Sequence, residues 1–126
     1  MADKGREKTI EMLNAAQYRE AMSAMEHGDV AAKTKVAYYK LAGLGDVEVD
    51  EKGAVALLAE SVKDGDSEAK WMLGLCCEYG MGIEQDIERA VLLYQQSKKG
   101  RNVVGEFLLE NGRGGRGSGG MEVWGL

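Results

Sequence analysis

The stretch AKWMLGLCCEYGMGIEQDIERAVLLY, residues 69–94, carries the clearest structural pattern of this chain. Apolar or small residues recur at i, i+3, i+4 and i+7 in both halves of the stretch, which is the spacing of one helix face. These residues are Ala69, Met72, Leu73 and Cys76 in the first half, and Ile87, Ala90, Val91 and Tyr94 in the second. Gly80 and Gly82 separate the halves, and glycine tolerates the left-handed backbone of tight turns. The stretch therefore predicts a helix–turn–helix unit.

The same unit occurs once more, earlier in the chain. A shift of 36 residues places Asp50, Ala54 and Leu57 on Asp86, Ala90 and Leu93, and a shift of 37 places Gly43 and Gly45 on Gly80 and Gly82. A period of this length is typical of helical solenoids, in which antiparallel helix pairs stack on one another. We therefore expect an all-α helical repeat solenoid of about six helices, wound as a right-handed superhelix without a β-sheet.

Residues that start and stop helices divide the chain. Aspartate stands at the predicted helix starts, where its carboxylate can accept a hydrogen bond from a free backbone N–H, and glycine stands just past the predicted helix ends. On this basis residues 1–111 form a helical repeat domain, and residues 112–126 form a flexible Gly/Arg-rich tail with an apolar end. Within the domain we expect an N-terminal helix at about 7–27, repeats at 30–65 and 66–101, and a partial repeat at 102–111.

The combined motif resembles the Sel1-like repeat, a branch of the tetratricopeptide superfamily. The residues that carry the resemblance are Ala69, Leu73, Gly74, Gly80, Gly82, Ile83, Asp86, Ala90 and Tyr94. It implies that Gly74, on the first helix of the unit (helix A), lets the second helix (helix B) approach closely. The chain departs from the family at Cys77, where an aromatic residue is usual, and at Val36-Ala37, which replaces the Leu-Gly pair. Proteins of this family are mostly adaptors and scaffolds, so the resemblance implies a protein–protein interaction module.

The concave face of a solenoid is its usual binding surface, and the resemblance lines this face with helix A residues. The expected partner-binding residues are Lys33, Lys35, Tyr39 and Lys40 in the first repeat, and Lys70, Met72 and Cys76 in the second. Lys33 and Lys70 occupy equivalent positions, so we expect paired positive charge that suits an acidic peptide. An ordinary solvated lysine face is the alternative, and Trp71 is expected to pack in the core.

Composition and motifs weigh against other classes of function. The net charge of −5 argues against a nucleic-acid footprint over the whole domain. No catalytic constellation, metal-ligand spacing or cofactor motif is visible, so we expect neither an enzyme nor a bound cofactor. Cys76 and Cys77 are adjacent and lack the spacing of a zinc site, and His27 is expected to close a helix. With no secretion signal or membrane-spanning run apparent, we expect an intracellular, cytoplasmic protein.

The C-terminal end allows more than one arrangement and more than one function. Residues 103–111 predict a helix A without a following helix B, so we expect its apolar side chains to be covered by Val123 and Trp124 or by a second copy in a homodimer. The Arg-Gly tail allows an RNA-associated protein as an alternative function. A structural subunit of a larger assembly is a further alternative.

Overall fold

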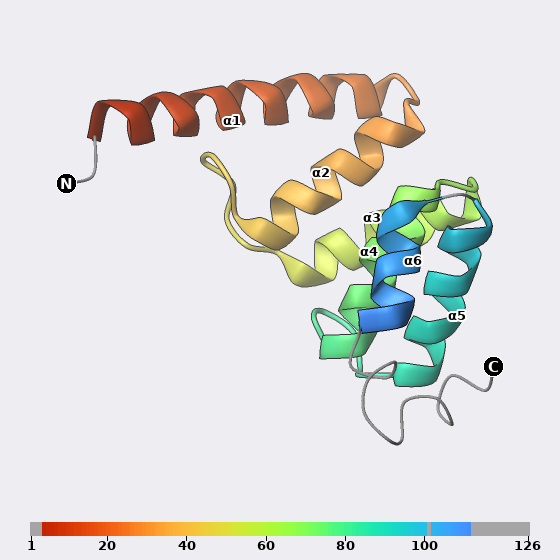
Figure 1. The fold of residues 1–126 in the computed structure, drawn as a ribbon. Coiled ribbons are helices and arrows are strands. Elements are labelled where there is room, and N and C mark those ends of the chain that lie inside the picture. The colour runs from red at the N-terminus through yellow and green to blue at the C-terminus, as the bar shows by residue number, and fades with distance from the viewer. Residues whose placement is uncertain (1–3, 101, 112–126) are drawn as a thin grey trace.

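The computed structural model describes residues 4–100 and 102–111, and these residues form six α-helices and no strand (Figure 1). The helices are α1 (Lys4–Glu26), α2 (Val30–Ala42), α3 (Glu51–Lys63), α4 (Ser67–Tyr79), α5 (Ile87–Lys99) and α6 (Val103–Asn111). The prediction of an all-α helical repeat is confirmed. The expectations for the tail at 112–126, including Val123 and Trp124, lie outside the described residues.

Aspartate residues begin the helices and glycine residues end them. The Asp29 carboxylate accepts a hydrogen bond from the backbone N–H of Ala32, at 3.1 Å, and so satisfies one of the free donors at the start of α2. At the other end of α2, Gly43 takes a left-handed backbone with φ +66°, and its N–H donates to the Tyr39 carbonyl. Asp66 and Gly80 cap the start and the end of α4 in the same way. These local signals explain why helix limits could be predicted from sequence.

Helices A and B alternate along the stack. The helices α2, α4 and α6 take the helix A position, and α1, α3 and α5 take the helix B position, each packed on its neighbours in the chain. The N-terminal half of α1 extends beyond the other helices in Figure 1, and Ile10, Met12 and Leu13 are exposed there. None of the helices in the described ranges is long and apolar enough to cross a membrane.

The core lies between α3, α4 and α5, where the two complete repeats meet. Its buried side chains include Leu58 of α3, Leu73 of α4 and Tyr94 of α5. A Cβ atom on Gly74 would lie only 2.7 Å from the Tyr94 Cδ1 atom, so the close approach of helix B that the resemblance implies is confirmed. The Tyr94 hydroxyl donates a 2.7 Å hydrogen bond to Oε1 of buried Glu78, which satisfies the two polar groups inside the core.

The loops after α2 and α4 contact the preceding helix B in the same manner. Gly45 lies against α1, where a Cβ atom would come within 2.8 Å of the Ala15 nitrogen. Gly82 lies against α3, where a Cβ atom would come within 2.9 Å of the Glu51 Cβ atom. Both glycines have positive φ values, +66° and +70°. The match shows that α1 packs on the first repeat as α3 packs on the second.

Candidate protein-interaction site

Two neighbouring hollows follow the helix A side of the stack. The hollow between α2 and α4, of about 220 Å³, is lined by Ala31, Thr34, Lys35, Tyr38, Asp66, Glu68 and Met72. The hollow between α1 and α2, of about 240 Å³, is lined by Gln17, Glu20, Ala21, Ala24, Asp29, Ala31, Ala32 and Lys35. Both are lined in part by Ala31 and Lys35, so they adjoin, and we call the pair the helix-A groove. It involves residues of α1, α2 and α4.

The size of each hollow indicates what it can hold. Sites for small molecules and cofactors usually enclose about 300–1000 Å³, and each hollow taken alone lies below that range. Within the described residues, no group of three or more His, Cys, Asp or Glu side chains is placed to hold a metal ion. Single side chains of a bound polypeptide fit hollows of this size, and two adjoining hollows can take neighbouring side chains of one segment.

Lys35 and Met72 are the predicted binding residues that lie in the groove. They occupy equivalent positions in the two repeats, since a shift of 37 residues places one on the other. Lys35 is exposed, and Met72 is half-buried against the core. The structure therefore brings these two predicted residues together on one surface.

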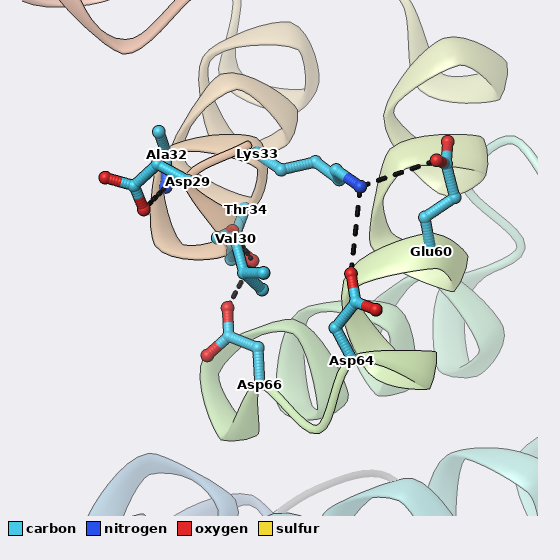
Figure 2. Close-up of polar contacts among 8 residues, drawn as sticks. All are labelled: Asp29, Val30, Ala32, Lys33, Thr34, Glu60, Asp64 and Asp66. Atoms are coloured by element: carbon cyan, nitrogen blue, oxygen red, sulfur yellow. Dashed lines mark hydrogen bonds and ion pairs between the residues drawn. The ribbon is translucent and has the colours of Figure 1, made fainter. Parts of the chain in front are cut away.

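Lys33 points away from the groove, toward α3 (Figure 2). Its Nζ atom lies 3.4 Å from Oε1 of Glu60 and 3.8 Å from Oδ2 of Asp64, and its side chain is half-buried. Lys70 takes the equivalent position on α4, where Gln96 stands in place of Glu60 and leaves no matching carboxylate. Neither lysine lines a hollow of the helix-A groove. The charge of Lys33 is thus compensated within its own repeat.

Lys40 is also engaged outside the groove. Its Nζ atom lies 3.8 Å from Oδ2 of Asp50, and it lines a different hollow, between α1 and the loop at 46–50. This third hollow, of about 650 Å³, is bordered by charged side chains of both signs, including Arg19 and Glu48. The sequence analysis did not predict it, because only the packing of the loop on α1 creates it.

Tyr39 and Cys76 require a correction, because both are buried and cannot meet a partner. They take equivalent positions on α2 and α4, on the side that packs against the preceding helix B. Tyr39 is 3% exposed, its ring centroid lies 5.8 Å from that of Tyr18, and its hydroxyl donates to Oε1 of Gln17 at 2.9 Å. Cys76 is fully buried in the core. Trp71 is half-buried and packs against this core.

The adjacent cysteines are poorly suited to nucleophilic chemistry. Burial, and to a lesser extent the neighbouring Cys77, raises the pKa of Cys76 to about 12. Burial also raises the pKa of the Cys77 thiol. Since the thiolate is the reactive form of cysteine, both side chains remain largely protonated and unreactive at neutral pH.

Tyr38 and Ala31 are groove residues that the sequence analysis missed. Tyr38 is 43% exposed and Ala31 is also exposed, and both line the hollow between α2 and α4. Their spacing could have identified them, since Ala31, Lys35 and Tyr38 stand at i, i+4 and i+7 on one helix face. Selecting lysines by charge alone overlooked that face.

Comparisons with known proteins agree with this architecture. The family model for the Sel1 repeat matches residues 30–66 and 67–102. DAP3-binding cell death enhancer 1 is 39% identical over 49 residues in Mus musculus and 37% identical over 49 residues in Rattus norvegicus. The matched segment is 39% of this chain and 10% of each relative, so the similarity is confined to a small part of those proteins.

Two solved structures share the fold. A Sel1 repeat protein from Oxalobacter formigenes matches with a TM-score of 0.62 and 26% identity, over 79% of this chain and 47% of that chain. The protective antigen c5321 of uropathogenic Escherichia coli, which displays an SLR fold, matches with a TM-score of 0.64 and 24% identity, over 85% of this chain and 24% of that chain. Since the two matched repeats span more than half of the sequence, the chain belongs to the Sel1 repeat family.

Proposed function

We propose that this chain is a non-enzymatic adaptor or scaffold that binds a segment of another protein in the helix-A groove. Sel1 repeats generally serve as protein–protein interaction modules, and the rodent relatives are named as proteins that bind another protein, DAP3. The observation that carries the proposal is that the two hollows adjoin at Ala31 and Lys35. Two adjoining hollows can take neighbouring side chains of one extended or helical segment.

The compensated charge of Lys33 bears on the nature of the partner. An acidic peptide was expected because Lys33 and Lys70 would present free positive charge on the binding face. Lys33 instead contacts Glu60 and Asp64, and only Lys35 contributes an ammonium group to the groove. The groove residues that support binding are therefore Lys35, Tyr38 and Met72, and the argument for an acidic partner loses its basis.

Site-specific photo-crosslinking tests the groove directly. A photoreactive phenylalanine analogue is placed at Tyr38, and a matched control places it at Leu92, an exposed residue of α5 outside both hollows. In extracts of cells that produce the protein, we expect adducts from position 38 and none from position 92. Met72→Glu should lower the adduct yield about tenfold, because it places a charge in an apolar contact, whereas Leu92→Glu should leave the yield unchanged. Adducts from position 92 alone would refute the proposal.

A homodimer through the C-terminal end remains a second proposal, favoured by the outer face of α6. Val103 is 76% exposed and Phe107 is 60% exposed, and they lie one turn apart on the same side of the helix. Burying such apolar surface contributes about 25 cal/mol per Å². We expect light scattering to show a dimer that Phe107→Glu converts to a monomer. A monomeric wild type, or a dimer that persists in the variant, would contradict this mode of association.

A further inference from the structure

We propose that the segment held in the helix-A groove is basic and amphipathic. An apolar side chain of the partner seats between Tyr38 and Met72, and its lysine or arginine side chains face the carboxylates of the groove. The inference rests on the proposed function, since it names the partner chemistry for the same surface. It reverses the partner charge expected from the lysines in the sequence, and the reason lies in the groove lining.

The balance of charge in the lining is negative. The groove carries one ammonium group, from Lys35, and four carboxylates, from Glu20, Asp29, Asp66 and Glu68. Three of these carboxylates lie at the N-termini of α2 and α4, where each helix end contributes about half a positive charge. After both helix ends and the lysine are counted, about two negative charges remain in the lining. A positively charged segment complements such a surface.

Two of these carboxylates, those of Asp66 and Glu68, accept hydrogen bonds from neutral groups. Asp66 accepts hydrogen bonds from the Thr34 hydroxyl and, at 3.2 Å, from the Glu68 N–H (Figure 2 shows the Thr34 contact). Glu68 accepts from Trp71 Nε1 at 3.0 Å and from Asn102 Nδ2 at 2.7 Å. The ion pairs found among the described residues engage Lys33 and Lys40, and neither lysine reaches a groove carboxylate. Cations of a partner can therefore interact with them.

The apolar part of the groove requires that the partner also carry an apolar side chain. Tyr38 from α2 and Met72 from α4 stand on either side of the hollow, and Ala31 leaves space between the helices. Methionine is flexible and polarisable, so it adapts to differently shaped apolar side chains. The apolar anchor provides affinity, while the surrounding carboxylates favour a basic sequence and speed its association.

Selection from a random peptide library displayed on phage, against the full chain, tests the partner chemistry. We expect the enriched peptides to carry a net positive charge and at least one large apolar side chain. Their binding should weaken as the salt concentration rises, because salt screens exposed charges. The paired substitution Glu20→Lys with Glu68→Gln should weaken binding about tenfold. The matched control, Glu88→Lys with Glu84→Gln, makes the same change in charge outside the groove and should have no effect.

The outcomes separate this inference from the proposed function. Peptides that lose binding with Met72→Glu but carry no excess of Lys and Arg would keep the groove as the binding surface and refute the basic partner. Basic peptides that bind Met72→Glu as well as wild type would refute the groove itself. Equal loss of binding in the two paired variants would show that only overall charge matters, and failure to enrich any peptide would also overturn the inference.

Discussion

Replacing Gly74 with leucine should destabilise the chain more than any surface substitution. A Cβ atom at this position would already lie 2.7 Å from Tyr94 Cδ1, and leucine adds three further carbon atoms in the same direction. Tyr94 is fully buried and its hydroxyl is bonded to Glu78, so the ring cannot swing aside without breaking a buried hydrogen bond. Overpacking of this kind costs about 1–3 kcal/mol or more of the free energy of unfolding. Urea denaturation followed by circular dichroism measures the loss.

The first repeat supplies a matched control for this prediction. At the positions equivalent to Gly74 and Tyr94 it has Ala37 and Leu58, and both are fully buried. We therefore expect Gly74→Ala to be destabilising beside Tyr94 and to be tolerated better in a Tyr94→Leu background. A double-mutant cycle gives the coupling energy between the two positions. Additive effects, or a melting temperature that Gly74→Leu leaves unchanged, would show that these side chains do not compete for space.

The fold could be predicted from the sequence because its signals are local. Asp29 and Gly43 define the start and the end of α2 through contacts within a few residues of each helix terminus. Apolar spacing then identifies each helix, and the shift of 36 or 37 residues shows that the two units are alike. The packing role of Gly74 was also accessible, because the family resemblance assigns a close helix approach to that residue.

The binding face was harder to predict because it depends on which side of each helix faces the groove. Successive residues of a helix are about 100° apart, so Lys33 and Lys35 lie on nearly opposite sides of α2. Lys35 lines the groove, whereas Lys33 turns toward Glu60 on α3. Tyr39 faces α1, where its ring packs against Tyr18 and its hydroxyl donates to Gln17. Charge and residue type could not separate these faces without the neighbouring helices.

Replacing Gly82 with alanine tests how tightly the repeats are joined. Gly82 has φ +70°, and an added Cβ atom would collide with the backbone of Glu51 at the start of α3. The left-handed backbone alone costs a non-glycine residue about 1–2 kcal/mol. The collision adds to this cost, because the contacted atoms belong to a helix backbone that cannot rotate away as a side chain could. We therefore expect a loss in the free energy of unfolding well above the backbone cost.

Gly65→Ala separates the two contributions to that loss. Gly65 also has a positive φ, +87°, but a Cβ atom there would meet nothing within 4 Å. Both variants therefore carry the backbone cost, and only Gly82→Ala carries the collision between the loop and α3. The difference between their free energies of unfolding in urea should be about 1–3 kcal/mol, the range of overpacked sites. Equal losses would mean that the loop moves away from α3 at little cost, and that the junction between the repeats is looser than the contact of Gly82 with Glu51 indicates.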